Sequence, residues 1–526
     1  LLQGTAAEPT HLVVSLAQLP QISSAQDHDA LTALFLALAK TLQTVSHCGI
    51  SIITEAAQGM KGQQSLARAD QAVVLGFAKN LLLEMADRMH STIDVDEWTA
   101  ASAQLCANAI QAAQTLPVLS VRQNQLLTPT LQRVEGDRLS HRKLNLTANA
   151  FYVVAGGTGA IGLAVAKWLA DKGALHIALL SRNGARGEEA KLQIETLRKN
   201  GVQVVVPAVD IADRAALDQV LQSLRAEHPI AGVIHAAGQF ELVPVGELTT
   251  VRCSQLMANK VLGLQWLDEL TVTDKLEFFV GFSSVASVWG SAGNFHYSAA
   301  NQAVDAIIQR RRQQGKPALT INWGPWAESG MVTDESGTQA AKIGLLQLEK
   351  NIGVQAFGRL LNSDEIQLTV ADIQWSRFKP VMSLLPVGTL FSRVSDLNAD
   401  VAADVVVELN QEDLAFKEEL ATCAPEERAD RLLVYLRQQL ARALQLNPLE
   451  VDDSQPLIDM GIDSLLAVEF KNRATQVTQV ELPVVRLLGG ANLRDVAKWM
   501  AESYGELSQT EQPVLDDEQA LVEGVL

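Results

Sequence analysis

Residues 151–162 form the stretch Phe151-Tyr152-Val153-Val154-Ala155-Gly156-Gly157-Thr158-Gly159-Ala160-Ile161-Gly162, which indicates the fold of the central part of the chain. The first five residues are apolar and predict a buried strand, and a helix with Val165 and Leu169 on one face is expected after the glycines. Glycines between a strand and a helix allow a tight turn and let a pyrophosphate approach the helix N-terminus, which favours negative charge. The stretch therefore predicts a nucleotide-binding turn. Its expected contacts are Gly156, Thr158, Gly159, Ala160 and Ile161.

The alternation of strand and helix extends over residues 149–391 and predicts an α/β domain. Helical crossovers between successive strands would make the strands parallel, as in a doubly wound, Rossmann-type sheet. The seven expected strands are residues 151–155, 175–180, 202–206, 231–235, 276–282, 318–322 and 367–371.

Residues 1–148 show a shorter version of the same alternation. No glycine-rich turn follows its strands, and no serine–tyrosine pair accompanies them. We therefore expect a truncated, Rossmann-like structural subdomain, with a second enzyme as the less favoured alternative. The expected strands are residues 11–16, 49–54 and 91–96, and the expected helices are residues 30–45, 69–87 and 99–115.

The C-terminal part differs in composition from the rest of the chain. Residues 392–426 are polar, acidic and alanine-rich, which predicts a linker. Residues 427–504 predict a small four-helix domain. The tail, residues 505–526, has six acidic residues and no basic residue, which is typical of a disordered or docking segment. Helices are expected at residues 428–444, 464–474 and 493–503.

The overall composition excludes several classes of protein. The net charge of −18 argues against binding of nucleic acid, which needs clustered Lys and Arg. The four cysteines form no CxxC pair, so we expect no zinc or other metal site, no disulfide framework and a cytoplasmic location. No stretch approaches the roughly 18 apolar residues that a membrane span needs, and no signal peptide is evident. Because the first residue is Leu1, we expect a piece of a longer polypeptide.

A second pattern points to carbonyl chemistry. The apolar run at residues 278–284 ends in Ser283 and Ser284, and Tyr297 follows at the start of a predicted helix, with Asn301 one turn later. A hydroxyl at a strand end and a phenol on the next helix could both donate hydrogen bonds to one carbonyl oxygen.

The ends of the other strands suggest which dinucleotide would bind. Arg182, beside Ser181, stands where an NAD site has an acid, and an arginine there suits the 2′-phosphate of NADPH; the alternative is a solvated side chain. Asp210, beside Ile211, would accept a hydrogen bond from adenine, or it caps a turn. The small residues Ala236, Ala237 and Gly238 would let the dinucleotide lie close, whereas His235 is expected to be a packed side chain.

The central domain resembles the short-chain dehydrogenase/reductase superfamily and, more narrowly, the ketoreductases of modular polyketide synthases. Most of the superfamily has a lysine four residues after the tyrosine, where this chain has Asn301. The polyketide ketoreductases share that departure, and Lys260 in Asn259-Lys260-Val261-Leu262-Gly263 matches their displaced lysine. The resemblance implies NADPH-dependent reduction of a β-ketoacyl thioester, with Tyr297 as the acid and Ser284 as a second donor. Lys260 would lower the pKa of the tyrosine, and Asn301 would orient Lys260 or a water.

The run Asp459-Met460-Gly461-Ile462-Asp463-Ser464-Leu465-Leu466 resembles the attachment sequence of acyl carrier proteins. Ser464 would then carry 4′-phosphopantetheine, whose phosphate gains from the N–H groups of a helix start; the alternative is a helix N-cap alone. The resemblance implies several partners: a β-ketoacyl chain on the carrier domain, a phosphopantetheinyl transferase, and ketosynthase and acyltransferase domains of the same synthase.

Stereochemistry follows only from the same resemblance. Some of these ketoreductases have Leu-Asp-Asp where this chain has Phe240-Glu241-Leu242, and others have a tryptophan eight residues before the tyrosine, where Trp289 stands. The pattern implies an L-configured β-hydroxyl, with simple packing of Trp289 as the alternative. Asn294 stands where one subclass has histidine. Met331 and Val332 are candidate substrate contacts, although they are equally compatible with core packing.

Two other functions stay open on the sequence alone. The chain could be a reductase of free small carbonyls, or an inactive reductase fold beside a working carrier domain. The filled catalytic positions and the glycine turn argue against the second alternative. The acyl length and branching, the final product, the flanking domains and the oligomeric state are not determined by the sequence.

Overall fold

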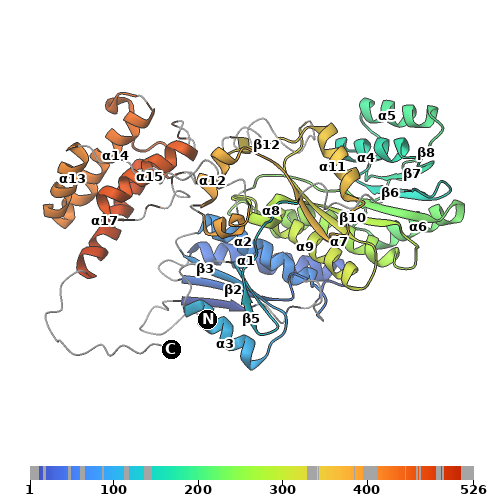
Figure 1. Cartoon of the computed structure of the whole chain (residues 1–526), viewed down its shortest axis with the longest axis horizontal. Coiled ribbons are helices and arrows are strands. Elements are labelled where there is room, and N and C mark those ends of the chain that lie inside the picture. Colours follow the sequence, from blue (N-terminus) through green and yellow to red (C-terminus); the bar gives the residue numbers. More distant parts are fainter. Residues whose placement is uncertain are drawn as a thin grey trace. The chain divides into compact units, whose positions relative to one another are not determined.

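The structure is a computed structural model in which the chain divides into two compact units, Leu1–Asp400 and Val401–Leu526 (Figure 1). Each unit is described by itself. The residues described are 11–15, 19, 21–44, 49–59, 65–85, 88–111, 118–134, 145–243, 245–327, 340–341, 343–383, 385–394, 411–444, 446–457, 460, 462, 464–480, 482, 487 and 491–510.

A seven-stranded parallel sheet forms the centre of the first unit, with the order β13-β11-β10-β9-β6-β7-β8. The chain starts in the middle of the sheet, winds to one edge and then returns to build the other side, so the doubly wound prediction is confirmed. All seven predicted strands are present, with ends shifted by no more than two residues. They are β6 (Phe151–Ala155), β7 (His176–Leu180), β8 (Gln203–Val205), β9 (Ile230–His235), β10 (Phe278–Ser284), β11 (Leu319–Trp323) and β13 (Gln367–Val370).

Helices cover both faces of this sheet because alternate strand residues point to opposite sides. In β6, Phe151, Val153 and Ala155 pack into one core with α6, α7 and α9, whereas Tyr152 and Val154 pack into a second core with α4, α5 and α11. These helices are α4 (Ala160–Asp171), α5 (Glu188–Lys199), α6 (Arg214–Glu227), α7 (Thr250–Leu270), α9 (Phe295–Gln313) and α11 (Lys350–Leu360). Shorter elements are α8 (Val285–Trp289), β12 (Leu345–Leu346), β14 (Asp372–Ile373), α12 (Trp375–Ser383) and η2 (Pro386–Phe391).

The N-terminal part of this unit has its own five-stranded sheet, with the order β1-β2-β3-β4-β5. The three predicted strands and three predicted helices are present. Two further strands, β4 and the antiparallel β5, were not predicted, because they are short and carry polar residues between few apolar ones. The elements are β1 (His11–Ser15), α1 (Ala25–Thr44), β2 (Gly49–Glu55), α2 (Ala69–Glu84), β3 (Met89–Val95), α3 (Ala100–Gln111), β4 (Val118–Arg122) and β5 (Gln125–Leu127).

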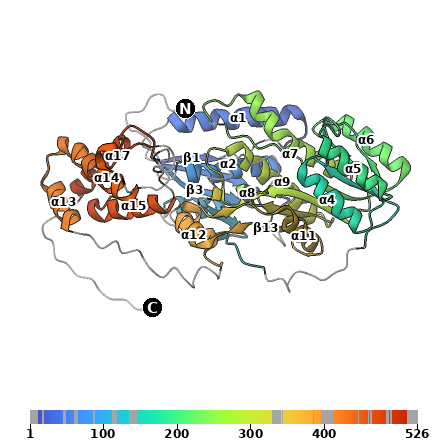
Figure 2. The same ribbon diagram turned by 90° about the horizontal axis from the view of Figure 1, so that it is seen from above.

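Helix α2 joins the two parts of the first unit. It is apolar on nearly all sides and buried over almost its whole length, as expected of a helix enclosed by protein. It packs on α9, while α1 lies along α7 (Figure 2). Helix α9, whose first turn contains Tyr297, therefore packs directly against the N-terminal part.

The second unit is a group of helices whose extent differs from the prediction. The predicted linker at residues 392–426 contains helix α13, in which Phe416 stacks on Tyr435 at 4.2 Å and Asp413 accepts a hydrogen bond from the Tyr435 hydroxyl at 2.8 Å. Helix α17 also extends through Thr510, into the predicted tail. Helix α13 was not predicted because its sequence is acidic and contains few apolar residues. The elements are α13 (Gln411–Thr422), η4 (Pro425–Glu427), α14 (Arg428–Leu444), η5 (Pro448–Glu450), α15 (Ser464–Thr478) and α17 (Leu493–Thr510).

The described residues include neither a helix that could cross a membrane nor a cluster of metal ligands. None of their helices combines the length and the apolar character that crossing a bilayer requires. These same residues contain no group of three or more His, Cys, Asp or Glu side chains that could hold a metal ion.

Candidate active site

The glycine turn lies between β6 and α4, as predicted. Gly156 has a φ of +78°, and a Cβ at this position would lie 2.8 Å from the backbone of Ala237 at the end of β9. The N-cap of α4 is Gly159, which has no side chain to occupy the helix N-terminus. The free N–H groups of the first turn therefore face open space, which suits a bound phosphate.

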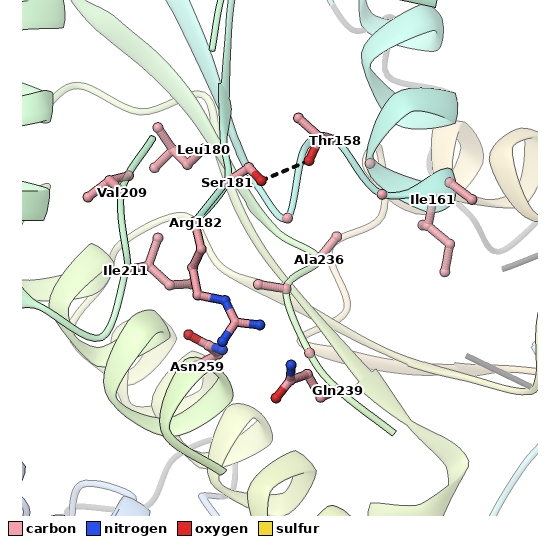
Figure 3. A pocket seen from close by; sticks show the side chains of 16 residues that line it. Thr158, Ile161, Leu180, Ser181, Arg182, Val209, Ile211, Ala236, Gln239 and Asn259 are labelled. Carbon is pink, nitrogen blue, oxygen red and sulfur yellow. Dashed lines mark hydrogen bonds between the residues drawn. The ribbon is translucent and has the colours of Figure 1, made fainter. Parts of the chain in front are cut away.

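A pocket opens at this turn (Figure 3). All of the predicted dinucleotide contacts line it except Asp210, whose carboxylate instead accepts a hydrogen bond from the Ala212 N–H at 3.0 Å. This is the turn-capping alternative. The lining residues are Gly156, Thr158, Gly159, Ala160, Ile161, Gly162, Leu180, Ser181, Arg182, Val209, Ile211, Ala236, Ala237, Gly238, Gln239 and Asn259.

The polar groups in the pocket come from four places: the glycine turn, the end of β7, the stretch after β9 and α7. The Thr158 hydroxyl donates to the Ser181 hydroxyl at 2.8 Å, which ties the glycine turn to the end of β7. The Arg182 guanidinium extends toward the amides of Gln239 and Asn259 (Figure 3). The sequence analysis missed these two amides, although each is adjacent to a residue that it selected, Gly238 or Lys260. The close backbone approach, the uncapped helix and the arginine all fit a phosphorylated dinucleotide.

The four candidate catalytic residues come together on the side of the sheet covered by α7 and α9. Ser284 is the last residue of β10 and the N-cap of α8, and Tyr297 lies in the first turn of α9. The Asn301 amide donates to the Tyr297 carbonyl at 2.8 Å, and its side-chain oxygen has no hydrogen-bond partner. The Lys260 ammonium donates to the Phe282 carbonyl at 2.8 Å and lies 5.9 Å from the centre of the Tyr297 ring.

Burial dominates the electrostatics of these groups. It raises the pKa of Tyr297, whose phenol is desolvated although the residue as a whole is partly exposed, and interactions with Ser284 and Asn301 oppose this rise. Burial also lowers the pKa of Lys260 to about 8, against an opposing effect of Asp305. His235 is fully buried, and its Nε2 atom lies 2.9 Å from the Asn259 carbonyl. Burial lowers the pKa of His235 to about 3, so it is neutral and packed, as expected.

Asp305 is a feature of this region that the sequence analysis missed. It is fully buried on α9 and accepts hydrogen bonds from Ser287 at 2.6 Å, from Thr320 at 2.8 Å and from Asn322 at 3.0 Å. Burial raises the pKa of its carboxyl, and these donors oppose the rise. An isolated aspartate in an apolar helical run, two turns after Tyr297, was the available signal.

The predicted substrate contacts have different surroundings. Trp289 is buried in an aromatic cluster, with its ring 5.7 Å from that of Phe378 and 5.5 Å from that of Phe391, which corresponds to the packing alternative. Met331 and Val332 lie outside the described residues. Phe240 packs edge-on against the Tyr297 ring at 5.1 Å.

The candidate attachment serine of the second unit, Ser464, begins α15 as predicted. A phosphate on a serine at this position would gain from the free N–H groups of the helix N-terminus. Asp463, which precedes it, lies outside the described residues.

Comparison with known proteins gives the same two assignments. The KR domain family matches residues 150–328, and the phosphopantetheine attachment site family matches residues 434–500. Polyketide synthase GfsB of Streptomyces halstedii is 30% identical over 443 residues, which cover 82% of this chain and 8% of GfsB. The chain therefore spans a small part of this relative.

Solved structures cover the first unit. The PlmKR1 ketoreductase from the first module of phoslactomycin biosynthesis in Streptomyces sp. HK803 is 32% identical, with a TM-score of 0.60 over 71% of this chain and 84% of that chain. A structure described as an A1-type ketoreductase is 30% identical, with a TM-score of 0.67 over 74% of this chain and 82% of that chain. With the glycine turn and the displaced lysine in place, the first unit belongs to the ketoreductases of modular polyketide synthases, and the second belongs to their phosphopantetheine-binding carrier domains.

Proposed function

We propose that this chain uses NADPH to reduce the keto group of a β-ketoacyl thioester, held on its own carrier domain, to a β-hydroxyl. One observation supports this most strongly: the candidate catalytic lysine borders the dinucleotide pocket. A Cβ on Gly238, which lines the pocket, would lie 2.7 Å from Cε of Lys260. A nicotinamide in this pocket would therefore lie beside the group that contains Tyr297 and Ser284.

The reaction follows from the residue types. The Ser284 hydroxyl and the Tyr297 phenol donate hydrogen bonds to the keto oxygen, which makes the carbonyl carbon electrophilic. NADPH, when bound, supplies the hydride. Tyr297 gives its proton to the developing alkoxide, and the Lys260 ammonium stabilises the phenolate that remains. Asn301 orients Lys260 or a water that returns the proton.

The preference for NADPH over NADH rests on Arg182. Its guanidinium extends into the pocket from the end of β7, where the ribose 2′ position of a dinucleotide would lie. A planar guanidinium binds a phosphate with two parallel hydrogen bonds, which NADH cannot accept in the same way.

Ser464 would carry the substrate through 4′-phosphopantetheine, added by a phosphopantetheinyl transferase. A tether raises the local concentration of the ketoacyl group at the reductase, so weak binding of the acyl chain suffices. Ketosynthase and acyltransferase domains of the same synthase would supply the chain. Three cysteines in the described part of the chain, Cys106, Cys253 and Cys423, are free, which fits a reducing cytoplasm.

An L-configured β-hydroxyl is the stereochemical part of the proposal, and it rests on Trp289 and on Phe240-Glu241-Leu242 in place of Leu-Asp-Asp. Trp289 ends α8, which lies between Ser284 and Tyr297 in the chain, and it is held there by its aromatic cluster. Chiral analysis of the reduced product measures this directly, and a D-alcohol would contradict it.

The reaction is tested by the loss of nicotinamide absorbance with a short β-ketoacyl thioester. Tyr297→Phe should abolish this loss of absorbance, whereas the matched control Tyr152→Phe should retain it. The Tyr152 hydroxyl lies outside the site and donates to the Glu277 carboxylate at 2.9 Å. Reduction by Tyr297→Phe at a near-normal rate would refute the mechanism. Activity only on carrier-bound substrate would exclude the free-carbonyl alternative, and failure of the wild type to bind NADPH would favour an inactive scaffold.

A further inference from the structure

Helix α2 lies in the N-terminal part of the first unit and does not line the pocket at Gly156, yet its polar side chains contact the catalytic segment. Lys79, Asn80 and Glu84 project from its C-terminal half toward residues 285–302. This segment connects Ser284 with Tyr297 and continues into α9. Each of the three side chains makes two or more hydrogen bonds there or to one another.

Asn80 makes the central contacts. Its amide oxygen accepts from the Ser291 N–H at 2.8 Å and from the Ser298 hydroxyl at 3.0 Å. Its amide nitrogen donates to the Glu84 carboxylate at 2.7 Å, and that carboxylate also accepts from the Gly293 N–H at 2.8 Å. The backbone just before Tyr297 is therefore held by two linked side chains of α2.

Lys79 holds the two ends of the same segment. Its ammonium donates to the Ser287 carbonyl in α8 and to the Gln302 side chain in α9, both at 2.8 Å. The side chain is buried, so these bonds form in a medium of low dielectric, where they are stronger than in water.

Two glycines bring the backbones into direct contact. A Cβ on Gly76 in α2 would lie 2.7 Å from the Ser298 carbonyl oxygen and 2.8 Å from Cα of Ala299. Gly290 has a φ of +88°, and a Cβ there would lie 2.7 Å from Cδ1 of Leu83. The space between α2 and the catalytic segment is thus filled by backbone atoms at Gly76 and by the Leu83 side chain at Gly290, which limits movement of the segment.

We propose that Lys79, Asn80 and Glu84 are positioning residues for the reduction, because they fix Ser284 and Tyr297 relative to each other. This inference rests on the proposed function. Two donors that hydrogen-bond to one oxygen must be held to within about 0.5 Å of the productive geometry, and a misplacement of about 1 Å can lower the rate ~100-fold. The N-terminal part of the unit thereby takes part in catalysis without touching the substrate.

The test compares Asn80→Ala with Gln71→Ala in the full chain. Gln71 lies on the same helix, but its amide oxygen accepts from the Glu55 N–H at 3.1 Å and its amide nitrogen donates to the Asp70 carboxylate at 3.3 Å, both within the N-terminal part. Asn80→Ala should lower kcat by about tenfold to 100-fold, with the KM for NADPH unchanged, because residues 285–302 are not among those that line the pocket at Gly156. Gln71→Ala should keep kcat within about twofold of the wild type, since only the fold of the N-terminal part is affected.

Hydrogen exchange gives a second measurement that does not depend on activity. The Ser291 amide should exchange at least about tenfold faster in Asn80→Ala than in the wild type, because it loses its acceptor. If Asn80→Ala does not fold, Ser298→Ala removes one of the same hydrogen bonds with little change in volume and should show a smaller loss of kcat in the same direction. An unchanged kcat in Asn80→Ala, or an equal loss in Gln71→Ala, would overturn the inference. If the wild type reduces no thioester but its Ser291 amide exchanges slowly, the proposed function is refuted, whereas the hydrogen bond between Asn80 and Ser291 is established.

Discussion

Substitution of Gly156 by alanine tests how the nucleotide turn is built. Gly156 has a φ of +78°, and its missing side chain lets the backbone of Ala237 approach. Gly201 provides a matched control, since its φ is +86° and a Cβ there would meet nothing within 4 Å. Both substitutions strain the backbone equally, but only Gly156→Ala also forces two backbone segments apart.

The magnitudes can be separated in the same way. Alanine at a positive φ costs about 1–2 kcal/mol, which both variants lose. In Gly156→Ala the new Cβ would lie 2.8 Å from the N and Cα atoms of Ala237, so the turn must shift. This shift weakens the bond from the Gly156 N–H to the Leu180 carbonyl at 3.0 Å and the bond from the Ala236 N–H to the Ala155 carbonyl at 2.9 Å. At about 1 kcal/mol for each bond, Gly156→Ala should lose about 2 kcal/mol more in the free energy of unfolding than Gly201→Ala.

Urea unfolding of the full chain, followed by tryptophan fluorescence, measures the difference in stability. A titration with NADPH, followed by nicotinamide fluorescence, measures the effect on the pocket. We expect the affinity for NADPH to fall at least ~tenfold in Gly156→Ala, which corresponds to a loss of about 1.4 kcal/mol in binding free energy, because the shifted turn lines the pocket. The affinity should stay unchanged in Gly201→Ala. Equal losses of stability in the two variants, or unchanged affinity in Gly156→Ala, would refute the reasoning.

Four further predictions concern individual charges and the carrier serine. Burial lowers the pKa of Lys260 to about 8, and the ammonium is the form that stabilises a phenolate, so kcat should fall as the pH rises through this value. The variant Lys260→Met should be slow, and its pH profile should lack this inflection. An inflection that persists in the variant would belong to another group. Burial also lowers the pKa of Lys79 from 10.5 to about 8, so between these pH values the unfolded chain binds more protons than the folded chain, and stability rises with pH. In urea titrations at several pH values, Lys79→Met should reduce the slope of the unfolding free energy against pH by about 1 kcal/mol per pH unit. An unchanged slope would count against the burial effect. Arg182→Ala should weaken the binding of NADPH by about tenfold to 100-fold and that of NADH little, as measured by fluorescence titration, and equal losses for both would argue against a 2′-phosphate contact. Ser464→Ala should abolish the gain in mass when the chain is treated with a phosphopantetheinyl transferase and coenzyme A, whereas a gain that persists would place the attachment elsewhere.

Most of the first unit could be predicted because its signals are local. The apolar runs that form β6 and β10 have the length of buried strands, and Gly156 and Gly159 stand between a strand and a helix where a tight turn needs them. Helix α13 was missed for the opposite reason. Its apolar residues Phe416 and Leu420 stand within an acidic stretch, and only the folded structure shows that Phe416 stacks on Tyr435 of α14 and that Leu420 is buried.

The sequence by itself determined the order of strands and helices, the nucleotide turn and the residue types suited to carbonyl reduction. These features depend on periodicity and on backbone conformation within a few residues, so each is recorded in a short stretch of the chain. Only the tertiary structure decided that Asp305 is buried among hydrogen-bond donors, and that Asn80 holds the backbone of Ser291, more than two hundred residues away. A contact between distant segments is set by how helices pack on a sheet, and such packing leaves no local pattern in one sequence.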